Sequence, residues 1–139
     1  IRPLNKTLAD NYTNCQAPKL QTAFIDIEAD FDPGRGYSSP QDPYSIITAI
    51  GIYLDWMETM ICLAVPPKRI SFEQANEMTK DMPEVILYKT EKEMLDAFLT
   101  LIDDADIISG WNSEGYDIPY IVNRITRVMV KQKLDDYVL

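Results

Sequence analysis

The sequence has 139 residues, 46% hydrophobic and 25% charged, a composition typical of a globular domain rather than a disordered or fibrous chain. With 13 basic and 22 acidic residues, its net charge of −9 argues against a protein that grips nucleic acid by bulk electrostatic attraction. The longest uncharged stretch, Pro43 to Leu54, has 12 residues. A membrane helix needs roughly 20, so we expect no membrane partner.

Histidine is absent, which excludes Ser-His-Asp and Cys-His catalysis and imidazole zinc sites within this chain. Cys15 and Cys62 are too few for a four-cysteine zinc site and could form at most one disulfide, which favours a reducing compartment. Any bound metal is therefore expected to be a hard cation on carboxylate oxygens, Mg²⁺ or Mn²⁺.

The first half of the chain predicts a strand, a long loop and a hairpin. Residues 1–20 are polar and show no clear period, so we expect a lead-in segment. Thr22–Glu28 alternates apolar and acidic residues, as a strand does. Prolines and glycines mark residues 29–43 as a loop, long enough to be either functional or mobile. Ser45–Leu54 and Thr59–Val65 then predict a β-hairpin.

The next segments predict a strand followed by a helix. Ser71–Met82 is ambiguous, with a short helix as one interpretation, and Val85–Tyr88 resembles a strand. Thr90 and Glu93 have the spacing of a capping box and open a helix that should run to about Asp103.

The last third predicts a short strand and a second helix. Ile107 and Ile108 indicate a short buried strand that ends in a turn at Gly110. From Ile118 to Met129, apolar residues recur at helical spacing. Strand, hairpin, strand–helix–strand and helix together predict an α/β fold.

Two acids lie on the first predicted strand. Asp26 and Glu28 are two residues apart, so both side chains leave the same face, with Cα atoms roughly 7 Å apart. On a buried or half-buried strand they would repel each other and lose hydration unless a divalent cation lay between them. The alternative is an edge strand whose acidic face is simply solvated.

A third acid precedes the last predicted helix. Asp117 is well placed to cap that helix, and on local features the cap is the favoured interpretation. The helix dipole would keep it ionised, so capping and metal binding are compatible roles. Asn112 is interpreted as a turn residue and Glu114 as a solvated loop acid, unless either contacts a ligand.

Aromatic and basic residues near these acids have two interpretations. Trp111, Tyr116 and Tyr120 could stack on a base, but aromatics beside a buried strand end are more often part of the core. The last helix carries four basic residues, which could touch phosphate but more commonly form a solvated face: Arg124, Arg127, Lys131 and Lys133.

Taken together, the segments resemble a known family. Phe24-Ile25-Asp26-Ile27-Glu28 resembles the first exonuclease motif of family B DNA polymerases, and Asn112-Ser113-Glu114-Gly115-Tyr116-Asp117 resembles the second. The longer run from Gly110 to Arg124 is similar to T-even-type bacteriophage replicative polymerases. The resemblance implies a ribonuclease H-like exonuclease fold, a central mixed β-sheet flanked by helices, that removes mispaired nucleotides from a primer 3′ end.

The resemblance also implies a mechanism and a set of site residues. Two Mg²⁺ or Mn²⁺ ions about 4 Å apart would clamp the scissile phosphate of single-stranded DNA. Asp26 would bridge both ions, Glu28 would hold the water-activating ion, and Asp117 would support the second ion through water. Asn112 would help to hold the terminal nucleotide. Tyr116 is similar to the aromatic that precedes the acid in the family motif, which implies a packing role, and it is grouped with Asn112 as substrate-binding.

The sequence departs from the family at the third exonuclease motif, Tyr-x-x-x-Asp, because no tyrosine here has an aspartate four residues later. Three carboxylates against two divalent ions leave a formal +1 charge, so we expect weakened metal binding, most of all for the ion at Glu28. The polymerisation motifs are absent too. We therefore expect residues 1–20 to be a lead-in and residues 21–139 a partial exonuclease domain, incomplete at its C-terminus.

Two other functions compete with the proofreading exonuclease. One is a catalytically incomplete scaffold or assembly fragment of a split or truncated polymerase, whose partner would be the rest of the polymerase or another copy of this chain. The other is a simple single-strand-binding module, against which the negative charge counts. By resemblance, the protein would be viral and act in the cytoplasm of an infected bacterial host.

Overall fold

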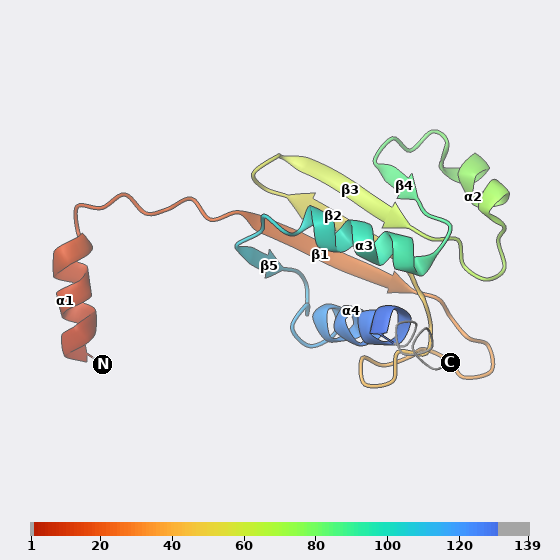
Figure 1. Ribbon diagram of the computed structural model, residues 1–139, viewed down its shortest axis with the longest axis horizontal. Coiled ribbons are helices and arrows are strands. Elements are labelled where there is room, and N and C mark those ends of the chain that lie inside the picture. Colours follow the sequence, from red (N-terminus) through yellow and green to blue (C-terminus); the bar gives the residue numbers. More distant parts are fainter. Residues whose placement is uncertain (1, 131–139) are drawn as a thin grey trace, which may run out of the picture.

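A computed structural model describes residues 2–130 of the chain, and five strands form one mixed sheet (Figure 1). In chain order, the elements are α1 (Arg2–Tyr12), β1 (Thr22–Ala29), β2 (Ile47–Leu54), β3 (Thr59–Ala64), α2 (Phe72–Thr79), β4 (Val85–Leu87), α3 (Glu91–Leu101), β5 (Ile107–Ser109), α4 (Asp117–Ile125) and a π-helical turn, η1 (Thr126–Val130). This arrangement confirms the predicted α/β class, with a mixed sheet flanked by helices.

The sheet has the strand order β4-β3-β2-β1-β5, so β1 lies inside it rather than at an edge. β1 and β2 are antiparallel, as are β2 and β3, and the latter pair forms the predicted hairpin. β5 joins β1 in parallel, and β4 joins β3 in parallel. β1 is therefore bonded on both sides along its first half.

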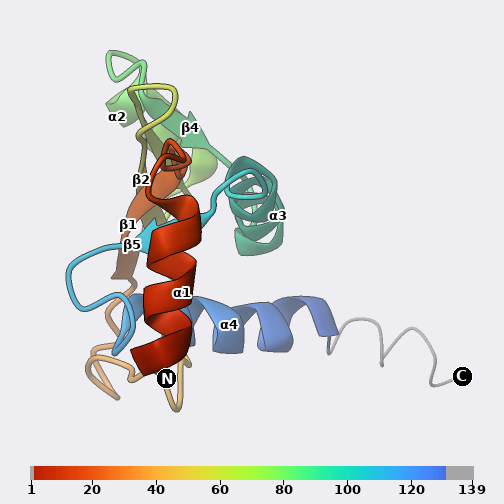
Figure 2. The same ribbon diagram turned by 90° about the vertical axis from the view of Figure 1, so that its left-hand side faces the viewer.

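Helices α3 and α4 lie on the same face of the sheet, and the other face is open (Figure 2). The core is packed between these helices and the inward-facing side chains of the strands. Its fully buried members include Ile50, Leu63, Met94, Phe98 and Tyr120. One face of β1 is consequently dry and the other meets solvent, which decides where its acids point.

The predicted capping box at the start of α3 is present. The Thr90 side chain accepts a hydrogen bond from the Glu93 backbone N–H, and the Glu93 carboxylate accepts one from the Thr90 backbone N–H. Ser71 and Gln74 form an equivalent box that begins α2. The ambiguous segment is thus a helix.

Two segments differ from their predictions. Residues 2–12 form helix α1, which was not predicted because its polar composition masks a stripe of Leu4, Leu8 and Tyr12. None of its residues is buried, and it lies away from the sheet (Figures 1 and 2). The predicted boundary between residues 20 and 21 stays a prediction. The prediction of a buried last strand is wrong, because Ile107 and Ile108 of β5 are 41% and 39% exposed at the edge of the sheet.

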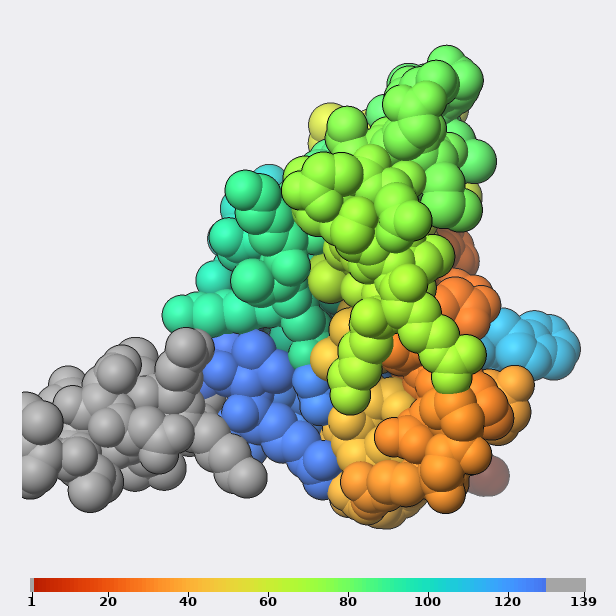
Figure 3. Space-filling model, turned by 90° about the vertical axis from the view of Figure 1, so that its right-hand side faces the viewer, coloured from red at the N-terminus to blue at the C-terminus, as the bar shows by residue number. Residues whose placement is uncertain are grey.

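The long loop between β1 and β2 is bound to helix α4 (Figure 3). Asn123 donates a hydrogen bond from Nδ2 to the Pro40 carbonyl (2.7 Å), and Arg124 donates from Nη1 to the Pro43 carbonyl (3.0 Å). The Tyr120 hydroxyl donates to the Ser45 carbonyl (2.9 Å) and shares a hydrogen bond with the Ser38 hydroxyl. These bonds satisfy the loop's carbonyls and fix it in place.

No helix within residues 2–130 is both long enough and apolar enough to cross a membrane.

Candidate active site

Strand β1 presents Asp26 and Glu28 on the open face of the sheet. Along the strand, buried Ala23, Ile25 and Ile27 alternate with exposed residues at every second position. The same-face placement is as predicted, and the two acids are exposed, as the alternative of a solvated acidic face expects. β1 lies between β2 and β5, but its pairing with β5 ends at Phe24, so at Asp26 and Glu28 it is paired with β2 alone.

The buried carboxylate of the site is Asp117, which is 3% exposed. It is the first residue of α4, whose N-cap is Tyr116, and no side chain caps this helix. The prediction that Asp117 is the cap is therefore wrong. Its Oδ2 atom is buried and has no hydrogen-bond partner. A buried carboxylate oxygen without a partner is costly, which marks a position where a ligand can compensate.

Asp117 and Asp26 are electrostatically coupled although they come from different elements. Burial raises the pKa of Asp117 first, and the charge of Asp26 raises it further. The backbone N–H groups of Ile27 and of Asp117 itself act in the opposite direction. Asp117 therefore lies against β1 near Asp26, where two anions repel each other.

The second-motif turn, residues 110–116, has the geometry of a tight structural turn. Asn112 adopts a left-handed conformation (φ 57°), and its carbonyl accepts hydrogen bonds from the N–H groups of Gly115 and Tyr116. A Cβ at Gly115 would lie 2.5 Å from Asn112 Oδ1, so a larger residue there would displace the exposed Asn112 side chain. Asn112 is thus an exposed turn residue, as the local features indicated, and its role toward a nucleotide stays a prediction.

Tyr116, at the end of the turn, lies near acids of both motifs. Its pKa is raised by burial and then by the charges of Asp117 and Glu28, so its hydroxyl lies in the same negative region. Its ring is 5.5 Å from that of Tyr120, and its hydroxyl approaches the Ser38 carbonyl. Tyr120 belongs to the core, as predicted, whereas Tyr116 is only partly buried.

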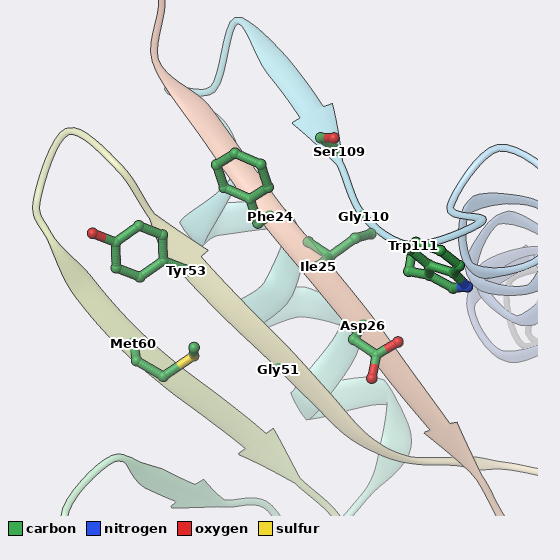
Figure 4. Close-up of a pocket in the computed structure, with 9 residues that line it drawn as sticks. All are labelled: Phe24, Ile25, Asp26, Gly51, Tyr53, Met60, Ser109, Gly110 and Trp111. Atoms are coloured by element: carbon green, nitrogen blue, oxygen red, sulfur yellow. The ribbon is translucent and has the colours of Figure 1, made fainter.

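An apolar pocket of about 600 Å³ lies on the open face beside Asp26. Phe24 and Tyr53 form its wall, with ring centroids 6.4 Å apart, and Met60, Gly51 and Trp111 also line it (Figure 4). Trp111 is 92% exposed, so the prediction that it belongs to the core is wrong. Sequence reasoning missed Phe24 and Tyr53. Their signal was the strand alternation, which puts Phe24 on the same face as the acids.

Two of the basic residues predicted on the last helix form ion pairs in the structure. Arg124 was predicted on a solvated face, but it is 8% exposed and pairs with buried Glu91 through Nε (2.8 Å) and Nη2. Glu91 also accepts a hydrogen bond from the Ile47 backbone N–H (2.8 Å). Arg127 forms an exposed pair with Asp42. Lys131 and Lys133 lie outside the described residues.

The carboxylates fit a divalent cation by chemistry rather than as a preformed cage. Within residues 2–130, no three acidic, cysteine or histidine side chains are close enough together to hold a metal ion. Mg²⁺, however, is usually bound by one or two carboxylates plus substrate phosphates and water. The unpartnered Asp117 oxygen and the repulsion from Asp26 are what such an ion would relieve.

Comparisons with known proteins agree with the motifs. The family described as "DNA polymerase family B, exonuclease domain" matches residues 4–137. The chain is 29% identical over 115 residues to the DNA polymerase of Red sea bream iridovirus, covering 79% of this chain and 11% of that protein. It is 30% identical over 129 residues to the DNA polymerase delta catalytic subunit of Plasmodium falciparum, covering 91% and 11%.

The DNA-directed DNA polymerase of Enterobacteria phage T4 is also similar, with 27% identity over 71 residues, 48% of this chain and 8% of that protein. The chain thus spans about a tenth of the length of these relatives. The match over 134 consecutive positions confirms the resemblance drawn from the two motifs. The chain belongs to the exonuclease domain family of the family B DNA polymerases.

Proposed function

We propose that this chain is the proofreading 3′→5′ exonuclease part of a DNA polymerase, and that Asp26, Glu28 and Asp117 are its catalytic carboxylates. The observation that carries the proposal is the convergence of the two motifs. Asp117 begins α4, yet its carboxylate, whose Oδ2 has no hydrogen-bond partner, is close enough to Asp26 on β1 to be perturbed by that charge. Family membership supplies the reaction class.

The same three carboxylates would hold the Mg²⁺ or Mn²⁺ ions, two in the family mechanism. When bound, such ions activate water and stabilise the departing 3′ oxygen. The chain's own contribution is to fix the acids on a rigid strand and at a helix start. Asp26 and Glu28 are exposed on the open face of the sheet, whereas Asp117 is buried.

The substrate we propose is the 3′ end of single-stranded DNA. The wall of Phe24 and Tyr53 offers a stacking surface for a base beside Asp26, and exposed Trp111 lies at the same pocket (Figure 4). Asn112 and Tyr116 stay proposed nucleotide contacts at the neighbouring turn. A net charge of −9 means that stacking and cations, rather than a basic surface, would have to bind the strand.

A scaffold function is the second candidate, and one observation favours it. Within the described residues, the three acids do not form a ready three-ligand metal site. A chain that spans about a tenth of its relatives would then serve by assembling with the rest of the polymerase or with another copy of itself. Similarity to the phage T4 enzyme supports a viral protein acting in the cytoplasm of an infected bacterial cell.

A cleavage assay separates the two functions. A 5′-labelled single-stranded oligonucleotide is incubated with the chain and Mn²⁺ or Mg²⁺, beside EDTA and Asp26→Asn controls. The exonuclease proposal expects stepwise shortening from the 3′ end, reduced more than about 100-fold in Asp26→Asn, which equals about 2.7 kcal/mol of transition-state stabilisation. No shortening by a folded chain that forms a stable complex with the remaining polymerase would favour the scaffold.

A further inference from the structure

Gly51 occupies a position where the fold does not require glycine. It lies in the middle of β2, paired with Asp26 on one side and Cys62 on the other. A Cβ there would meet only the Asp26 backbone oxygen, at 3.9 Å, which is an ordinary contact. Its backbone is not left-handed, since Gly36 is the one glycine in residues 2–130 with positive φ.

Other glycines near the site behave differently. A Cβ at Gly110 would lie 2.3 Å from the Ile25 carbonyl oxygen, and one at Gly115 would lie 2.5 Å from Asn112 Oδ1. The contact at Gly110 is with backbone, so that position needs glycine, whereas a Cβ at Gly115 would displace the end of an exposed side chain. A glycine inside a strand weakens the strand, so its presence at position 51 calls for a reason outside the fold.

The reason lies on the open face of the sheet. Gly51 lines the same pocket as Asp26, with Tyr53 two residues further along β2 (Figure 4). Tyr53 pairs with Phe24, so the aromatic wall and the acid lie two residues apart along β1, roughly 7 Å. Gly51, which has no side chain, therefore lies next to Asp26 and beside the wall of Phe24 and Tyr53.

We propose that Gly51 is a specificity-determining residue whose missing side chain admits the sugar and phosphate of the 3′-terminal nucleotide to Asp26. The inference rests on the proposed function and deepens it. With a base against Phe24 and Tyr53 and a phosphate at Asp26, the sugar between them would lie over the sheet next to Gly51. A side chain there would stand in that path while leaving every acid in place.

A size series tests this inference: Gly51→Ala, Gly51→Val and Gly51→Leu. The matched control is Cys62→Val, which puts the same side chain in the same row of the sheet but one strand further from Asp26 and outside the pocket. Four quantities are measured: the thermal unfolding midpoint, Mn²⁺ binding, the cleavage rate on single-stranded DNA, and the affinity for deoxyadenosine monophosphate.

The inference expects Gly51→Val to unfold at the same or a higher temperature and to bind Mn²⁺ as the wild type does. Its cleavage rate and nucleotide affinity should fall at least tenfold, less for alanine and more for leucine, while Cys62→Val stays at wild-type values. Two outcomes would overturn this inference but not the proposed function. One is a wild-type cleavage rate in Gly51→Val, and the other is a lowered unfolding midpoint that accounts for the loss of cleavage in that variant. A wild-type chain that neither binds nor cleaves would overturn the proposed function and this inference with it.

Discussion

Asp117 is the site residue whose environment in the structure differs most from the one predicted from the sequence. Its place at the end of the second motif was visible in the sequence, as was the same-face placement of Asp26 and Glu28. Its burial was not, because it depends on the packing of α4 against β1, about ninety positions earlier in the chain. Local features favoured a helix cap, whereas tertiary packing leaves Oδ2 buried and without a partner.

The raised pKa of Asp117 predicts how stability depends on pH. Burial and the Asp26 charge raise its folded-state pKa above the ordinary value of 3.8, so the folded chain holds this proton more tightly than the unfolded chain. The resulting stabilisation is present at low pH and is lost as pH rises from about 3.8 through the folded-state pKa. Asp117→Asn should therefore unfold at a higher temperature than the wild type at pH 7, and the gap should close toward pH 4.

Circular dichroism melts between pH 3.5 and 8 check this prediction. Asp42→Asn is a control of opposite sign, since its hydrogen bond and ion pair with Arg127 lower the pKa of Asp42, and that stabilisation is lost as pH falls. If Asp117→Asn instead melted below the wild type at pH 7, the carboxylate would be a stabilising cap after all.

The same coupling predicts that Asp26 and Asp117 do not act independently. Asp26→Asn removes one source of the repulsion, so it too should raise the melting temperature at pH 7. The double variant should gain less than the sum of the two single gains, because either substitution already relieves the shared repulsion. Strict additivity in this double-mutant cycle would mean that the two carboxylates do not interact.

Among the helices and strands, features set by neighbouring residues could be predicted best, and contacts between distant residues least. The capping boxes of α2 and α3 and the alternation of β1 each depend on residues a few positions apart. The partner of Arg124 is Glu91, 33 residues earlier, and the loop carbonyl that it binds, that of Pro43, lies 81 residues earlier. Nothing in the helical period of α4 distinguishes this buried arginine from a solvated one.

The buried Arg124–Glu91 pair should be the main tie between α4 and α3. Arg124→Met leaves the Glu91 carboxylate buried without its cation, and breaking a pair of this kind costs about 3–5 kcal/mol of unfolding free energy. Arg127→Met, in the π-helical turn η1 that follows α4, breaks an exposed pair and should cost much less. Urea unfolding of both variants measures the difference; equal losses would contradict the tie.

For the whole molecule, the sequence predicted the class, the hairpin and the motif-bearing segments, because each follows from periodicity over several residues. It did not predict that one sheet face stays open, since that depends on α3 and α4 both covering the other face (Figure 2). Helix α1 was missed for a related reason: it buries nothing, so its apolar stripe is short and its polar residues dominate.

The exposed α1 predicts that the sheet is stable without it. A chain that begins at Leu20 should melt within about 4 °C of the full chain, the shift that roughly 1 kcal/mol produces in a domain of this size. The Gln21 and Thr22 backbone bonds to Asp106 and Asp55 are kept in this variant. A larger drop, measured by circular dichroism, would show that α1 packs on the body.

The most direct test of a cation site formed by the two motifs is to locate the residues that bind Mn²⁺. Paramagnetic broadening of backbone amide signals would be followed in the wild type and in Asp26→Asn, with the exposed acidic turn of Asp103, Asp104 and Asp106 as an internal comparison. If the two motifs form a cation site, Mn²⁺ first broadens the amide signals of Asp26, Ile27 and Asp117, and Asp26→Asn abolishes that broadening. Broadening centred on the acidic turn, or unchanged in Asp26→Asn, would contradict a cation site formed by the two motifs.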